Sequence, residues 1–192
     1  MVGLFELWLP ILVSAVAVFI VSAIIWMALG YHKKDIQFLD NEEAFDAAIS
    51  PMNIRPGLYM FPGCHGKDLK SEAFQTRWKA GPWGIITIHP KAPSFGLNLL
   101  RVFLIYLVIS AIAGYLAGIG LAPGTEYMRV FRVVGTAALL GHCFGGLAND
   151  FFLGKPTRFI VTGLIDGVIF ALVTAGIFAA MWPGAPAGLP TP

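Results

Sequence analysis

The chain contains four apolar runs long enough, or nearly so, to cross a lipid bilayer as helices. A spanning helix needs about 20 apolar residues, because each residue advances it by about 1.5 Å across about 30 Å of hydrocarbon. The runs are Leu7 to His32, Val102 to Ala122, Val133 to Ala148 and Phe159 to Trp182. The third is short and is expected to extend outward through Met128. The pattern predicts an α-helical membrane protein with four transmembrane helices.

Composition agrees with this class of protein. Hydrophobic residues make up 57% of the 192 residues and charged residues only 12%, whereas soluble domains carry roughly 25% charged residues. The net charge is only +2 and the basic residues form no patch, so nucleic acid is not an expected partner. The expected surroundings are a lipid bilayer.

The first run has a competing interpretation as a cleaved signal peptide, since Ala28 and Gly30 are small residues of the kind that precede a cleavage site. Its flank argues against cleavage, because the residues before it include Glu6 and no Lys or Arg. The run also exceeds the roughly 7 to 15 residues usual for a signal core. We therefore expect a transmembrane helix.

Four segments follow from these boundaries. They are a first transmembrane helix in residues 1–32, a small α+β segment in 33–98, a three-helix transmembrane bundle in 99–182 and a Pro/Gly-rich tail in 183–192. The α+β segment is therefore an insertion between the first and second helices.

Basic residues near the helix ends predict the orientation, because cytoplasmic flanks retain Lys and Arg. With four spans, six basic residues lie near helix ends on one side of the membrane, and only Arg129 and Arg132 lie on the other side. We therefore expect residues 33–98 in the cytoplasm and both termini on the periplasmic side of a bacterial inner membrane. The basic residues on the first side are Lys33, Lys34, Lys91, Arg101, Lys155 and Arg158.

The insertion is patterned as two short helices alternating with two short strands. Asp40 or Asn41 is placed to cap the first helix, which Ser50 and Pro51 end. The second helix has Ser71 as its expected cap.

The expected strands are Leu58 to Phe61 and Ile85 to Ile88. The second helix carries Phe74 and Trp78 one turn apart, so their rings share a face. A unit of this size buries too little surface to be very stable alone, so we expect it to lean on the membrane or on a partner.

Pairs of glycines four residues apart occur in three of the four runs. Helices in lipid gain little from hydrophobic association and pack closely where small residues let their backbones approach. These pairs predict a tight bundle of three helices, and the first run, which has no such pair, is expected at the periphery. The pairs are Gly114 with Gly118, Gly141 with Gly145, and Gly163 with Gly167.

Two stretches in the insertion carry a family resemblance. They are PGLYMFP, from Pro56 to Pro62, and GPWGIITIHP, from Gly81 to Pro90, and three apolar runs follow them, the last with the acid Asp166. In these features the chain resembles a family of small bacterial multi-span membrane proteins without an established activity. The resemblance implies the architecture and a bacterial source and adds no chemistry.

Two ionisable residues lie inside predicted spans, His142 in the third and Asp166 in the fourth. Such groups are costly in lipid and are retained mainly where they face protein, water or a ligand. His142 lies eight residues before Asp150, and Asp166 lies eight after Arg158, which places both about 12 Å inside the membrane. In an antiparallel hairpin they are positioned to share a hydrogen bond, either as a proton relay or ion site or as a structural contact worth about 1 kcal/mol. The structural role is favoured, because transport sites usually recruit several polar groups near the midplane.

Cys64 and His65, with His32 just before the insertion and His89 within it, are weak candidates for a zinc or copper site. Their spacing matches no C-x-x-C or H-x-x-x-H pattern, so we expect ordinary loop residues and no metal. His142 is the one histidine within a span, so a bis-histidine haem is not available in one chain. No cofactor is expected, although a pigment or single-ligand haem held within a larger complex stays open.

The sequence shows no phosphate-binding loop and no group of residues that forms a nucleophile triad. The leading hypothesis is a non-catalytic accessory or scaffold subunit of a bacterial inner-membrane complex, with protein partners or copies of itself. The alternative is a small transporter or proton-conducting protein that uses His142 and Asp166.

Overall fold

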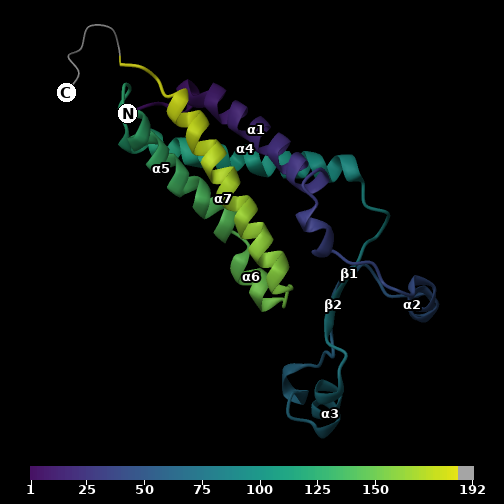
Figure 1. The fold of residues 1–192 in the computed structure, drawn as a ribbon. Helices are drawn as coiled ribbons and strands as arrows, with labels where there is room; N and C mark the ends of the chain where they lie inside the picture. The colour runs from purple at the N-terminus through teal and green to yellow at the C-terminus, as the bar shows by residue number, and fades with distance from the viewer. Residues whose placement is uncertain (186–192) are drawn as a thin grey trace. The chain divides into compact units, whose positions relative to one another are not determined.

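The computed structural model describes residues 1–185, and residues 186–192, most of the predicted tail, lie outside the described part. The chain divides into two compact units (Figure 1). The first joins Met1–Gln37 to Phe95–Pro192, and the second is Phe38–Ser94.

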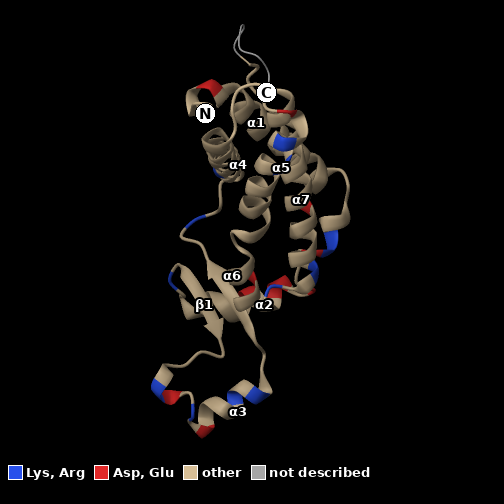
Figure 2. Cartoon of the chain, turned by 90° about the vertical axis from the view of Figure 1, so that its left-hand side faces the viewer, with Lys and Arg blue, Asp and Glu red and all other residues tan. Residues whose placement is uncertain are grey.

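The first unit contains four helices that are long and apolar enough to cross a membrane. Charged side chains are sparse along most of their length (Figure 2). The number of candidate spans predicted from the sequence is therefore confirmed. They are Leu4–Met27, Phe95–Gly120, Tyr127–Phe152 and Thr157–Ala180.

The first, second and fourth spans are regular, whereas the third is composite. The first combines η1 (Leu4–Leu7) with α1 (Trp8–Met27), the second is α4 (Phe95–Gly120), and the fourth is α7 (Thr157–Ala180). The third consists of α5 (Tyr127–Leu139), the π-helical turn η5 (Leu140–Phe144) and α6 (Leu147–Phe152). A short 3-10 helix, η2 (Tyr31–Lys34), follows α1.

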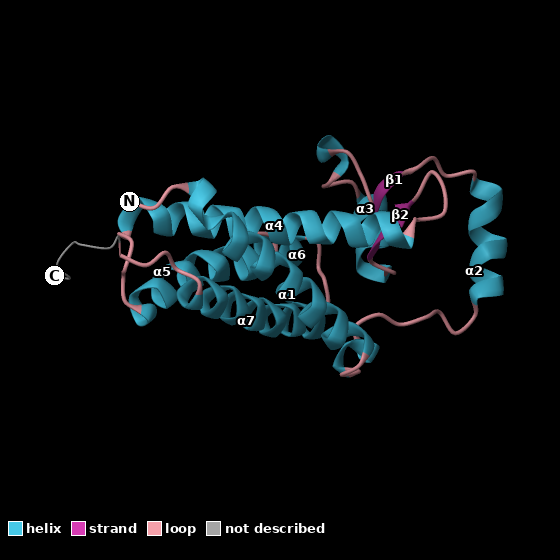
Figure 3. Ribbon diagram, turned by 90° about the horizontal axis from the view of Figure 1, so that it is seen from above, coloured by secondary structure: helices cyan, strands magenta, loops and turns pink. Residues whose placement is uncertain are grey.

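The four spans form a closed ring in which α1 packs against α4 and α7, and α5 packs against the same two helices (Figure 3). The expectation that the first helix lies at the periphery is wrong. Its Ser14, Ala15 and Val18 are fully buried, because Ser and Ala permit the close helix approach that glycine permits elsewhere.

The predicted glycine pairs differ in what surrounds them. A Cβ added to Gly114 would lie 2.9 Å from Phe178 of α7, and one on Gly118 would lie 2.5 Å from the carbonyl oxygen of Val2. A Cβ on Gly141 would meet Ile109 at 2.9 Å, so these three glycines lie where another segment approaches closely.

Of the remaining glycines, Gly167 lies in a close helix contact, whereas Gly145 and Gly163 do not. A Cβ on Gly167 would lie 2.6 Å from the Cys143 sulfur and 3.0 Å from the His142 carbonyl oxygen. Gly145 meets only the Gly141 carbonyl of its own segment, at 3.3 Å, and Gly163 has open space within 4 Å. The spacing rule therefore does not apply to Gly145 and Gly163, because it identifies small residues without showing which side of the helix faces a neighbour.

The second unit has the two helices and two strands that the sequence predicts. Asn41 caps the first helix by accepting a hydrogen bond from the Ala44 amide at 2.9 Å, and Ser71 caps the second by accepting from Phe74 at 3.3 Å. The strands are antiparallel, with Gly57 opposite Ile88. The elements are α2 (Glu42–Ile49), η3 (Ser50–Met52), β1 (Gly57–Phe61), η4 (Gly66–Asp68), α3 (Glu72–Ala80) and β2 (Gly84–Ile88).

Two alanine substitutions in α7, one turn apart, test the packing of the bundle. Gly167→Ala should lower the thermal stability of the detergent-solubilised protein, because overpacking of a close contact costs about 1–3 kcal/mol. Gly163→Ala should be neutral or slightly stabilising, because Ala is favoured over Gly in a helix by about 0.5–1 kcal/mol and the space is open. Equal melting temperatures for the two variants would contradict this packing.

Candidate functional site

A cluster of buried polar side chains connects the segment after α1 with the first half of α7. α1 ends before Gly30, whose φ of 68° lies in the left-handed region that glycine adopts readily. The chain turns there, and η2 places Tyr31 and His32 against α7. We call Tyr31, His32, Asp35, Arg158, Thr162 and Asp166 the charge cluster.

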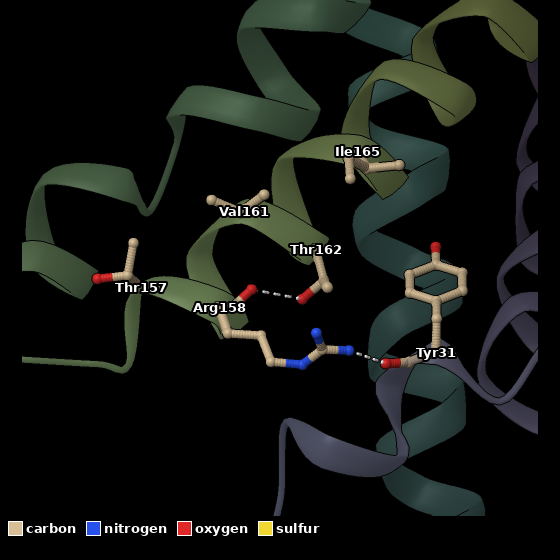
Figure 4. A pocket seen from close by; sticks show the side chains of 6 residues that line it. All are labelled: Tyr31, Thr157, Arg158, Val161, Thr162 and Ile165. Carbon is tan, nitrogen blue, oxygen red and sulfur yellow. Dashed lines mark hydrogen bonds between the residues drawn. The ribbon is translucent and has the colours of Figure 1, made fainter.

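Asp35 is the acceptor on one side of the charge cluster. Thr162 donates from Oγ1 to Asp35 Oδ2 at 2.6 Å, and His32 Nδ1 lies 2.7 Å from the same oxygen. Arg158 pairs with the other oxygen, its Nε lying 2.9 Å from Asp35 Oδ1. Arg158 also donates from Nη2 to the Tyr31 carbonyl oxygen at 2.6 Å (Figure 4).

Asp166 is the acceptor on the other side. The Tyr31 hydroxyl donates to Asp166 Oδ1, and His32 Nε2 lies 3.0 Å from Asp166 Oδ2. Trp26 of α1 stacks on the His32 ring, with 4.0 Å between ring centroids and 4° between planes. The imidazole therefore has one carboxylate at each nitrogen and an aromatic face against it.

The cluster is largely closed to solvent. The side chains of His32, Asp35 and Asp166 are 4%, 0% and 7% exposed, whereas that of Arg158 is 49% exposed. Buried charges are tolerated only when they are paired and hydrogen-bonded. Asp35 meets this condition through Thr162, His32 and Arg158. Asp166 accepts a hydrogen bond from Tyr31, whereas His32 Nε2 beside it has no hydrogen-bond partner among the described residues.

The cluster also sets the ionisation of Asp35 and Tyr31, which lie outside the spans. The hydrogen bond from Thr162, with help from His32 and Arg158, lowers the pKa of Asp35 despite its burial. Its pairing is therefore complete at neutral pH and is lost only as the pH falls through that lowered pKa. Burial and the bond to Asp166 raise the pKa of the Tyr31 hydroxyl, so Tyr31 stays a protonated donor.

An open groove of about 590 Å³ borders the cluster (Figure 4). Three cluster residues face it, and they give the otherwise buried site a path to its surroundings. The groove is lined by Tyr31, Thr157, Arg158, Val161, Thr162 and Ile165.

The structure does not bring the predicted pair His142 and Asp166 together. Among the described residues, Asp166 has Tyr31 and His32 as its polar partners, and His142 Nε2 is buried without a hydrogen-bond partner. The His142 ring packs instead against Phe170, at 5.6 Å and 72°. The depth argument treated the third span as a continuous α-helix, whereas η5 and the break after it change the direction in which His142 points.

Sequence reasoning missed most of the cluster. Arg158 counted only as an orientation signal, and His32 only as a weak metal candidate. A usable signal was the spacing on each side, since His32 and Asp35 are three residues apart, and Thr162 lies one turn from both Arg158 and Asp166. Each set lies on one helical face, but the sequence does not show that the two faces meet.

The weak metal candidates are not assembled into a site. Cys64 and His65 are both exposed, and Cys64 is a free thiol, as is the buried Cys143. Within residues 1–185, no three His, Cys, Asp or Glu side chains are arranged to hold a metal ion.

Comparison with protein families, curated proteins and solved structures found no match to the chain. The resemblance to a bacterial membrane protein family therefore stays a prediction.

Proposed function

We propose that the chain is a non-catalytic accessory or scaffold subunit of a bacterial inner-membrane complex, in which four spans anchor Phe38–Ser94 as a docking unit. The observation that supports this proposal is the exposed apolar surface of that unit. Of the large apolar side chains in residues 38–94, all of which the structure describes, only Phe74 is buried.

The exposed surface includes a face of the two-stranded sheet. Side chains alternate between faces along a strand, so Leu58 and Met60 of β1 share a face with their partners Thr87 and Ile85 of β2. Leu58 is 60% exposed and Met60 is 51% exposed. A two-stranded sheet is marginally stable without cover, and contiguous exposed apolar side chains mark interaction sites.

A protein surface suits this unit better than the lipid surface. The first part of the unit is acidic, because residues 38–54 contain Asp40, Glu42, Glu43 and Asp46 and no Lys or Arg. Cytoplasmic membrane surfaces are negatively charged and attract basic segments. The acidic α2 therefore favours a protein partner.

The charge cluster gives the anchor a fixed exit point. Its hydrogen bonds join the segment after α1 to α7. The bonded residues are separated by 127 or 135 positions in the sequence. Because residues 36 and 37 follow it directly and lead into the docking unit, the cluster fixes where the chain leaves the bundle.

The proposed location is a bacterial inner membrane, with the docking unit in the cytoplasm, from the six-to-two bias of basic residues near the helix ends. Cys64 is exposed in that unit and Cys143 is buried. With Cys143 replaced by Ala, an impermeant thiol reagent should leave Cys64 unmodified in intact cells and modify it once the membrane is opened. Labelling of Cys64 in intact cells would contradict the proposed orientation and place the docking unit outside the cell membrane.

Substitutions on the sheet face test the docking role. Native mass measurement after detergent extraction should find the wild-type chain bound to a different protein, and Leu58→Ser with Met60→Ser should remove that protein because the apolar contact is lost. Leu69→Ser is the matched control, since Leu69 is 51% exposed in the same unit but lies outside the sheet. Recovery of copies of this chain alone, in wild type and variants, would count against an accessory subunit.

The alternative, a small transporter or proton-conducting protein, now depends on Asp166 with His32 rather than with His142. The observation that favours it is the 3.0 Å approach of His32 Nε2 to the buried carboxylate of Asp166, because ionisable groups in spans often serve proton transfer. Asp166→Asn would abolish proton flux across proteoliposomes at unchanged protein abundance, since an amide does not exchange a proton at neutral pH. Absence of flux in the wild type would exclude this alternative.

A further inference from the structure

The His32 ring has a carboxylate oxygen close to each nitrogen, with Asp35 at 2.7 Å and Asp166 at 3.0 Å. A neutral imidazole carries only one N–H, and its other nitrogen has a lone pair. If His32 were neutral and both carboxyls ionised, one nitrogen lone pair would face a negatively charged oxygen. His32 Nε2 is buried and has no hydrogen-bond partner among residues 1–185, although Asp166 Oδ2 lies 3.0 Å away. One further proton at this site makes both nitrogen–carboxylate contacts electrostatically attractive.

The proton count also balances the charge. Arg158 offsets Asp35, and a protonated His32 offsets Asp166, so the four groups together are neutral. Removal of the proton would leave one negative charge without a partner where the side chains have almost no solvent contact. Breaking a buried ion pair in this way is strongly unfavourable.

Within residues 1–185, no basic side chain other than His32 forms an ion pair with the Asp166 carboxylate. From η2 it faces the hydroxyl of Tyr31, and Tyr106 of α4 is the other titratable group with which it interacts. Both are neutral donors. Lys33 and Lys34 of η2 are exposed, and among the described residues neither forms a salt bridge with Asp35 or Asp166.

Two further features suit a bound proton. The Trp26 indole is stacked on the His32 ring, and aromatic faces attract cations. The groove reaches Tyr31, Arg158 and Thr162, so the edge of the cluster is open to the surroundings of the bundle.

We propose that His32, between Asp35 and Asp166, is a proton-binding site whose occupancy holds η2 against α7. With the proton bound, both ring nitrogens donate and the contacts are attractive. Loss of the proton to water makes the contact between His32 Nε2 and Asp166 Oδ2 repulsive, and η2 separates from α7. Raising the pH therefore releases the segment that leads into residues 38–94. This inference goes beyond the docking role, because it requires no partner.

Hydrogen exchange of the amides of residues 31–37, in the full-length protein in detergent, tests the proposal. After correction for the intrinsic effect of pH, the opening constant of this segment should rise with pH by up to about tenfold per unit, as expected when one proton is released. The amides of α5 (Tyr127–Leu139), which carries none of the cluster residues, provide the internal control and should show no such rise.

The Asp166→Asn variant separates the effect of a proton on His32 from the other contacts that hold η2 against α7. The side-chain amide of Asn can donate to Nε2 of a neutral His32 while Nδ1–H donates to Asp35, so the contacts are satisfied without the extra proton. The variant should keep η2 protected and lose the pH dependence. The same slope in wild type and variant, or no slope in the wild type, would overturn the proposal.

A spectroscopic measurement on the wild type decides the question even if the variant does not fold. Nitrogen-15 spectra of labelled histidine should show His32 with a proton on both ring nitrogens at neutral pH, after assignment by replacing His65, His89 and His142 one at a time. A single protonated nitrogen on His32 would refute the proton site. Neither result depends on whether Phe38–Ser94 docks a partner.

Discussion

The contact of His32 with two carboxylates is the interaction on which the arrangement of the first unit depends. Asp35 lies three residues further along the chain and Asp166 is in the middle of α7, so the imidazole joins segments separated by more than 130 residues. Apolar helix faces alone define the rotation of neighbouring helices loosely, because many lipid-facing and protein-facing residues are interchangeable. A buried ion pair has one good geometry, and its loss leaves an unpaired charge. The pairing therefore specifies how α1 and α7 meet.

The rest of the bundle combines close approach at small residues with a core of buried apolar side chains. Phe178 of α7 packs over Gly114 of α4, and these helices are not neighbours in the ring. The aromatic ring therefore crosses the centre of the bundle at one end, while the charge cluster closes the space between α1 and α7 at the other. Between them, Ser14 and Ala15 keep α1 close to its neighbours.

Much of the architecture could be predicted from the sequence because it follows from local properties. Run length gives the spans, Asn41 and Ser71 give helix starts, and two short apolar runs give both strands. The position of α1 and the partner of Asp166 could not be predicted in this way. Both depend on which helical faces meet across long sequence separations, and a glycine spacing or a depth estimate reports distance along a helix but not direction around it. Gly163 illustrates this limit, since it shares the spacing of Gly167 but has no neighbour.

The π-helical turn in the third span makes the two halves of that span mechanically unequal. A π turn is an α-helix with one residue inserted, and one residue rotates everything beyond it by about 100°. The half before it, α5, has Val130, Val134 and Ala138 in the core, whereas α6 beyond it has no buried residue. His142 and Cys143, in the π-helical turn, lie in close contact with Gly167 of α7. This contact holds the turn in place. A change from π-helical to α-helical geometry at residues 140–144 would therefore rotate α6 about the helix axis while α5 stays in place.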